Sequence, residues 1–221
     1  MKNTILMIMF LAIGIAFMNA QDQVQDMDRD QDRLMMVDGD LLQIRDRDQI
    51  RLRDKVTLND GTILMDNGTY LTANGERERL RNGECLDMDG IRYRNEYQYR
   101  YKVQRENNGL SQAQIEERNR NRTQFIKIDG NIYRIQNQIQ NRVREQLQLA
   151  NGESIGPDGQ LMNQNMNKMR LKNGECLDMN GNMFENTYRH RQRINNTQIK
   201  RSRLFKPSKK TNLPKKKGKI G

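Results

Sequence analysis

The feature that most constrains the fold of this chain is an internal duplication. At an offset of 91 residues, positions 79–88 align with positions 170–179 without a gap, and Asp38-Gly39 aligns with Asp129-Gly130. About a third of roughly sixty aligned positions are identical, and one offset explains every match. The body of the chain is therefore one small structural unit written twice. Its apolar share, 34% of the whole chain, can fill a thin core but not a large α/β enzyme core.

Glycine placement indicates the local structure of each unit. Twelve of the sixteen glycines follow Asn or Asp, and Asx-Gly pairs favour the type I′ turns that join antiparallel strands. After Asp60 the pairs recur every seven or eight residues, which leaves about five residues for each strand. We expect one turn to be lost in the second unit, because Asn165 is followed by Met166. The predicted turn glycines are Gly39, Gly61, Gly68, Gly83, Gly90, Gly130, Gly152, Gly159, Gly174 and Gly181.

The pattern predicts an all-β fold of two small antiparallel β-meander repeats with disordered acidic N-terminal and basic C-terminal flanks. The segments are a signal peptide (1–20), an acidic flexible leader (21–34), β repeat 1 (35–103), a polar linker (104–123), β repeat 2 (124–188) and a basic disordered tail (189–221).

Residues 91–103 alternate tyrosine and aliphatic side chains with arginine, lysine and glutamine. This alternation predicts a half-buried strand that closes the first sheet. The alternative is a Tyr/Arg platform for a glycan or nucleic acid. In the linker, Ser111 as N-cap with Gln114 as capping-box partner predicts a short helix over 111–122, with coil as the alternative.

The chain also resembles a known family. The glycine-punctuated stretch 80–90 and the Thr-Leu-Asn-Asp-Gly-Thr stretch 57–62 resemble the domain of unknown function 6799 of exported Bacteroidota proteins. The resemblance covers both units, departs at Glu153 and Met166, and implies export and a small β repeat. It implies no catalytic residues.

The two ends of the chain suggest export and a charged tail. Residues 5–18 are almost wholly apolar and precede Ala20, as in a signal peptide, and they are short for a membrane span. We therefore expect an exported protein, in the periplasm or at the cell surface, with no transmembrane segment after signal removal. The formal net charge of +11 resides in residues 189–221, which hold thirteen Lys/Arg and no acidic residue. We expect this tail to contact anionic envelope polymers or lipid head groups and to bind no specific nucleic acid.

Cys85 and Cys176 are the only cysteines and occupy equivalent repeat positions. A disulfide between them, two separate partly buried thiols and an intermolecular bridge are all open alternatives.

Three closely spaced methionines, Met162, Met166 and Met169, are the residues that a Cu(I) site would use, since soft thioethers select Cu(I). The simpler interpretation is that methionines fill a thin, irregular β core.

The composition offers little catalytic chemistry, with one His, no Trp and no phosphate-binding or nucleophile motif. We expect no enzyme activity, no catalytic residues and no cofactor. The sequence predicts an exported structural or binding module of the cell envelope, and the alternative is a Met-rich Cu(I)-handling periplasmic protein.

Overall fold

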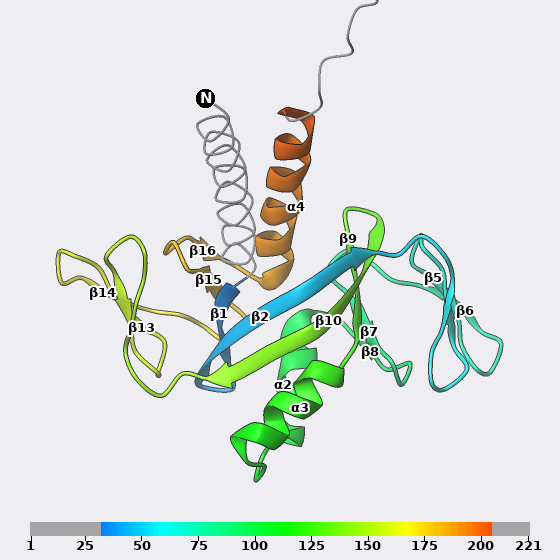
Figure 1. Cartoon of the computed structure of the whole chain (residues 1–221), viewed down its shortest axis with the longest axis horizontal. Helices are drawn as coiled ribbons and strands as arrows, with labels where there is room; N and C mark the ends of the chain where they lie inside the picture. The colour runs from blue at the N-terminus through cyan, green and yellow to red at the C-terminus, as the bar shows by residue number, and fades with distance from the viewer. Residues whose placement is uncertain (1–31, 205–221) are drawn as a thin grey trace, which may run out of the picture.

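The computed structural model describes residues 32–204, with side chains up to residue 197. The protein is mostly β, with one eight-stranded antiparallel sheet, two four-stranded meanders and three helices among these residues (Figure 1). The expected signal peptide, the leader up to residue 31 and the tail from residue 205 lie outside the described residues.

Two long hairpins form the centre of the large sheet. Strands β1 (Asp32–Val37) and β2 (Asp40–Arg51) form the first, and β9 (Gln124–Ile128) and β10 (Asn131–Arg142) form the second. Strands β2 and β10 pair with each other, and the pairs Ile44–Gln140 and Gln49–Ile135 exchange under the 91-residue offset. The two copies are therefore related by a local two-fold axis between these strands.

The outer strands of the large sheet are exchanged between the copies. Strands β7 (Cys85–Asp87) and β8 (Arg92–Tyr93) of the first copy extend the sheet beside β9 of the second. Strands β15 (Cys176–Asp178) and β16 (Met183–Phe184) of the second copy extend it beside β1 of the first. The strand order is β16-β15-β1-β2-β10-β9-β7-β8, so the sequence repeats 35–103 and 124–188 are not separate packing units.

The meanders lie at opposite ends of the central strands (Figure 1). The first has β3 (Val56–Thr57), β4 (Ile63–Leu64), β5 (Thr69–Leu71) and β6 (Arg77–Arg79). The second has β11 (Leu147–Gln148), β12 (Ser154–Ile155), β13 (Gln160–Met162) and β14 (Lys168–Arg170). These strands have two or three residues, fewer than the predicted five, because much of each seven- or eight-residue period forms the turn.

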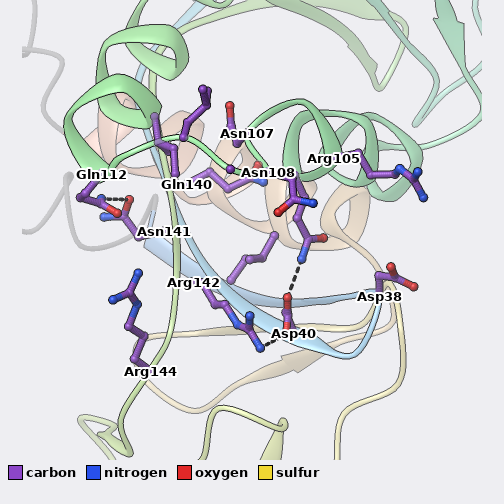
Figure 2. Close-up of a pocket in the computed structure, with 15 residues that line it drawn as sticks. Asp38, Asp40, Arg105, Asn107, Asn108, Gln112, Gln140, Asn141, Arg142 and Arg144 are labelled. Carbon is purple, nitrogen blue, oxygen red and sulfur yellow. Dashed lines mark hydrogen bonds and ion pairs between the residues drawn. The ribbon is translucent and has the colours of Figure 1, made fainter.

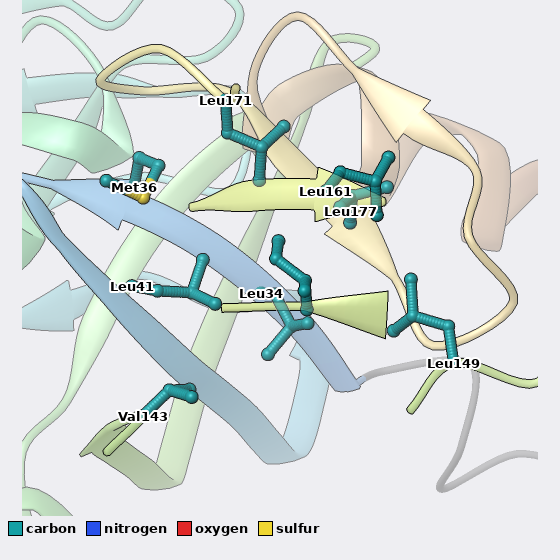
Figure 3. Close-up of a cluster of buried hydrophobic side chains, with 9 residues drawn as sticks. Leu34, Met36, Leu41, Val143, Leu149, Leu161, Leu171 and Leu177 are labelled. Carbon is teal, nitrogen blue, oxygen red and sulfur yellow. The ribbon is translucent and has the colours of Figure 1, made fainter. Parts of the chain in front are cut away.

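Each meander packs on the hairpin of the other copy. Figure 3 shows Leu34, Met36 and Leu41 of the first copy buried among leucines of the second. The second cluster reverses this arrangement, since Phe125 and Ile132 pack with meander residues of the first copy. Burial of these side chains, at about 1.5–3 kcal/mol each, therefore stabilises the join between the copies as well as each copy.

The turns differ in type from the prediction. All ten predicted turn glycines have positive φ, between 73° and 90°. Only the two central hairpin turns are type I′, because Asp38 (φ 52°) and Asp129 (φ 48°) are also left-handed. In a typical meander turn the glycine alone is left-handed and its N–H bonds to the carbonyl three residues back, as Gly61 does to Leu58 at 3.1 Å. This is a type I turn followed by a bulge residue.

The turn expected to be lost in the second copy is present, so that prediction is wrong. Met166 occupies the position of Gly75, with φ 63°, and its N–H bonds to the Asn163 carbonyl at 3.0 Å. The Asn163 side chain accepts from the Asn165 and Asn167 N–H groups and holds the turn without a glycine.

The strand predicted over residues 91–103 is wrong beyond Tyr93. Helix α2 (Glu96–Glu106) begins at Asn95, whose side chain accepts from the Gln98 N–H at 3.1 Å. Its buried residues, among them Tyr99 and Val103, follow a helical spacing. Residues four apart lie on the same face of a helix and also on the same face of a strand, so the spacing of the tyrosines fits both a helix and a strand.

The linker forms the helix α3 (Gln112–Asn121), with the predicted capping box of Ser111 and Gln114 present. The prediction of a disordered tail over residues 189–221 is wrong for residues 189–204, which belong to helix α4 (Thr187–Leu204). Arg191 is buried in this helix because carboxylates neutralise it, a compensation that net charge along the sequence does not reveal.

Helices α2 and α4 cover the face of the large sheet opposite the meanders. Met35 packs with residues of α2, whereas its neighbours Leu34 and Met36 pack with a meander. Successive side chains of a strand point to opposite faces, so the two layers lie on opposite sides.

Candidate functional site

A polar pocket of about 540 Å³ lies where the helical connection meets the central hairpins. It is lined by the β1–β2 turn, the end of α2, the α2–α3 connection, the start of α3 and the end of β10 (Figure 2). A cavity of this size accommodates a ligand of one or two sugar rings. In the second copy the equivalent residues 198–202 lie within helix α4, so among the described residues that copy has no equivalent of this wall.

The walls of the pocket are held by interactions between elements. Asp40 of β2 forms an ion pair with Arg142 of β10 at 2.6 Å and accepts a hydrogen bond from Gln104 Nε2 of α2 at 2.7 Å. On the α3 side, Gln112 Nε2 donates to Asn141 Oδ1 at 2.9 Å. These contacts tie both helices to the sheet, so the pocket is preformed.

Several polar groups at the pocket have no partner among the described residues. The carbonyl oxygens of the Gln104 and Asn107 side chains are buried and accept no hydrogen bond from residues 32–197. Arg144 is exposed, and no hydrogen bond or ion pair of its guanidinium group is found within residues 32–197. Buried acceptors without donors are rare in folded proteins and often mark a bound molecule or water.

The back of the pocket leads to a buried ion-pair cluster. Gln140 lines the pocket, and its side chain donates to the Arg100 carbonyl at 3.4 Å. The Arg100 guanidinium donates to Gln138 Oε1 at 2.6 Å and to Asp46 Oδ1 at 3.1 Å. The pocket is therefore connected to the centre of the molecule through one arginine.

The cluster joins three arginines to two carboxylates at the local two-fold axis. Asp46 Oδ2 lies 2.6 Å from both Arg33 Nη1 and Arg191 Nη2. Glu96 pairs with the same two arginines and with Arg100 Nη2 at 2.8 Å. All five side chains are at most 2% exposed. The cluster fastens β1, β2, α2 and α4 to one another.

The electrostatics of this cluster keep both carboxylates ionised. Burial alone would raise the pKa of Asp46, but the charges of Arg191, Arg33 and Arg100 outweigh it and hold that pKa well below its usual value. The same arginines lower the pKa of Glu96 against the effect of its burial. Carboxylates saturated in this way accept hydrogen bonds and cannot act as general acids near neutral pH.

His190 borders the cluster as a neutral side chain. Burial, reinforced by the charges of Arg33 and Arg191, lowers the pKa of His190 to about 3. Neither ring nitrogen has a hydrogen-bond partner in the part of the chain that the structure describes, and the ring packs edge-on against Phe184 at 5.1 Å.

The cluster was not predicted, and the duplication reveals only part of it. Arg100 and Arg191 are equivalent at the 91-residue offset. The other members have no charged counterpart, since Arg33, Asp46 and Glu96 correspond to Gln124, Asn137 and Thr187. Other positions are also charged in one copy alone, such as Arg47 and Asp48, which align with Gln138 and Ile139, so the comparison of the copies does not single out the members of the cluster.

The two cysteines are free, buried thiols. Five strand spacings separate β15 from β7, about 24 Å at about 4.8 Å each, whereas a disulfide needs Cα atoms within about 7 Å. The intramolecular disulfide is therefore excluded. Burial raises the pKa of Cys85 and Cys176 to about 12, so neither thiol is reactive near neutral pH.

The three methionines of the alternative Cu(I) site do not share a face. Met169 pairs with Leu161 and Met162 pairs with Lys168, so Met162 and Met169 point to opposite sides of the β13–β14 hairpin. Met166 lies in the turn beyond and is 73% exposed. Among the described residues, no group of three His, Cys, Asp or Glu side chains is placed to hold a metal ion.

The Tyr/Arg platform considered for residues 91–103 does not form, because helix α2 divides its tyrosines. Tyr93 and Tyr99 are buried in the core. Tyr97 and Tyr101 stack on each other at 6.5 Å, are half-buried and pack against the cluster that contains Met35. Arg105, at the rim of the pocket, donates to the Tyr101 hydroxyl at 3.1 Å.

Fold and site together define a class of protein, a duplicated antiparallel β protein whose two copies exchange their outer strands. A family model named Domain of unknown function (DUF6799) matches residues 31–91 and 123–183, more than half of the chain. The chain therefore belongs to the DUF6799 family, with the domain present twice. Comparisons with curated proteins and with solved structures find no match. Within residues 32–204, no helix has the length and apolarity needed to cross a membrane.

Proposed function

We propose that this chain is an exported, non-catalytic binding module of the cell envelope, in the periplasm or at the cell surface. Its binding site is the pocket between the α2–α3 connection and the end of β10. The observation that carries the proposal is the preformed pocket of about 540 Å³, whose walls present unpartnered polar groups.

The chemistry of the pocket favours binding over turnover. The carboxylate of Asp40 already pairs with Arg142 and accepts a hydrogen bond from Gln104, and both contacts hold the wall in place. The strongly perturbed carboxylates, Asp46 and Glu96, are neutralised inside the molecule, where they stabilise the fold. Structural ion pairs therefore account for the perturbed groups that would otherwise suggest catalysis.

Export is supported by the apolar run of residues 5–18, which precedes Ala20. The basic segment 205–221 adds a second, nonspecific attraction to anionic envelope polymers or lipid head groups. Such contacts weaken with salt, whereas binding in a shaped pocket persists.

Cell fractionation combined with intact-mass measurement tests the proposal. We expect a mature chain that begins at Gln21 in the envelope or secreted fraction. The full-length chain in the cytoplasm would contradict it.

A second measurement separates the pocket from the tail. Purified mature chain and a variant without residues 205–221 are sedimented with isolated cell envelopes at low salt and at about half-molar salt. We expect the truncated variant to lose only the salt-sensitive part of the binding. Absence of sedimentation for both proteins would contradict a binding role.

A further inference from the structure

The ligand class of the pocket follows from the groups that line it, and this step rests on the proposed binding function. Six amide side chains line the cavity: Gln104, Asn107, Asn108, Gln112, Gln140 and Asn141. An amide presents a donor and an acceptor in one plane, which suits a ligand with several hydroxyl groups, since each hydroxyl both donates and accepts.

The acceptors that lack donors set a further requirement. Gln104 uses its amide nitrogen on Asp40, and Asn107 uses its nitrogen on Asn119 Oδ1 at 3.1 Å. In both residues the carbonyl oxygen is the group left without a partner among the described residues. The pocket therefore offers acceptors, directly or through a bridging water, to a ligand that carries hydrogen-bond donors.

The charge at the rim calls for an anion. Three arginines and two aspartates line the cavity. Arg142 is paired with Asp40, and Arg105 donates to Tyr101, which leaves Arg144 as the guanidinium without a partner among the described side chains. Figure 2 shows Arg144 on the β10 side of the cavity and Asn108 on the helix side. A guanidinium binds a carboxylate with two parallel hydrogen bonds.

We infer that the pocket binds a uronic acid, with the sugar carboxylate on Arg144 and the sugar hydroxyls on the amides of Asn108 and its neighbours. The sugar is either free or a residue of an acidic polysaccharide, since both present the same carboxylate and hydroxyls. A cavity of about 540 Å³ holds one such ring with room for a second.

Isothermal titration of the mature full chain with galacturonate and with trigalacturonate tests this inference. We expect binding of at least one of them, and neutral galactose and maltotriose at least tenfold weaker. Similar affinity for the two acidic probes would indicate that the ligand is the free sugar. Tighter binding of trigalacturonate would indicate that the ligand is a residue of a polysaccharide.

Three variants locate the site. Arg144→Gln should weaken galacturonate or trigalacturonate binding by about tenfold or more, because a charge-assisted hydrogen bond is lost. Arg144→Lys should lose less, since it keeps the charge without the planar fork. Asn108→Ala should weaken binding about threefold or more. Both residues are exposed, so folding is unaffected. Arg77→Gln, the same charge change on β6 and away from the pocket, should leave binding unchanged.

The inference is overturned if neutral sugars bind as tightly as acidic ones, or if Arg144→Gln and Arg77→Gln behave alike. It is also overturned if inorganic phosphate binds as tightly as galacturonate, which would describe a simple anion site. Envelope sedimentation that persists while both acidic probes fail to bind would remove the ligand class and leave the proposed function standing. Cytoplasmic retention of the chain would remove the proposed function itself.

Discussion

Met166 holds a backbone conformation that its side chain disfavours. Its φ of 63° is left-handed, which costs an L-residue with a Cβ roughly 1–2 kcal/mol relative to glycine. We predict that Met166→Gly raises the free energy of unfolding by about 1 kcal/mol. The equivalent position of the first copy gives the matched control, since Gly75 (φ 83°) changed to Met should lower stability by a similar amount. Urea denaturation measures both, and a destabilised Met166→Gly would contradict the prediction.

Asp46 connects three arginines inside the protein. Removing its charge leaves the guanidinium groups of Arg33, Arg100 and Arg191 with only Glu96 to neutralise them. We predict that Asp46→Asn costs about 3–5 kcal/mol, as expected when one partner of a buried ion pair is removed. Glu78→Gln, at a pair with Arg92 that is 39% exposed on each side, should cost under about 1 kcal/mol. Equal losses of stability in the two variants would contradict the prediction, because the buried cluster would then contribute no more than the exposed Glu78–Arg92 pair.

His190 makes stability depend on pH. Its pKa is about 3 in the folded protein and about 6.5 in the unfolded chain, so between these values the unfolded state binds a proton that the folded state does not. The contribution of His190 to the free energy of unfolding is therefore fully present above pH 6.5. It falls as the pH decreases, by up to about 1.4 kcal/mol per pH unit. We predict that His190→Phe flattens this decline between pH 6.5 and pH 4.5. Urea titrations of both proteins at several pH values measure the slope, and parallel slopes would contradict the prediction.

At the scale of the element, the turn that joins each meander to the large sheet requires a glycine. Gly83 has φ 86°, Glu84 N–H bonds to the Arg81 carbonyl at 3.1 Å, and a Cβ at Gly83 would lie 3.5 Å from Tyr188. We predict that Gly83→Val costs about 1–3 kcal/mol through backbone strain. Gly174→Val, at the equivalent turn (φ 90°), should cost a similar amount. Thermal melting followed by circular dichroism measures both variants. Unchanged melting temperatures would contradict the prediction that a side chain at these positions strains the backbone.

Element type was predictable where local chemistry decides it. The Asx-Gly turns and the Ser111 capping box depend on neighbouring residues, which the sequence displays directly. Helix α2 was missed because its side chains satisfy two periodicities, and contacts distant in sequence, such as Glu96 with Arg191, decide between them. Its start was nevertheless marked by Asn95, a favourable N-cap residue.

At the scale of the whole molecule, the duplication was predictable but the exchange of strands was not. An offset shows that two segments are alike, and it does not say whether β7 returns to its own hairpin or to that of the other copy. The pocket was equally hidden, because the connection 107–111 that forms its wall occurs once and has no repeat signal.

The exchange predicts how the molecule responds to a cut. A protease site inserted between Asn108 and Gly109, both exposed, separates the copies covalently without touching a strand. We predict that the two pieces stay together after cleavage, since each hydrophobic cluster contains residues of both copies. Size-exclusion chromatography before and after cleavage measures this, and elution as two separate species would contradict the exchanged core.

The place where the two-fold axis crosses the molecule has a consequence for how this chain can change over generations. In a pair of identical subunits, every substitution near such an axis appears twice, and an added arginine brings its own repelling twin. Here the two halves are encoded separately. Arg33, Asp46 and Glu96 could therefore become charged while Gln124, Asn137 and Thr187 opposite them did not. A cluster with three cations and two anions is an odd-numbered arrangement that perfect symmetry forbids, and covalent fusion makes it accessible.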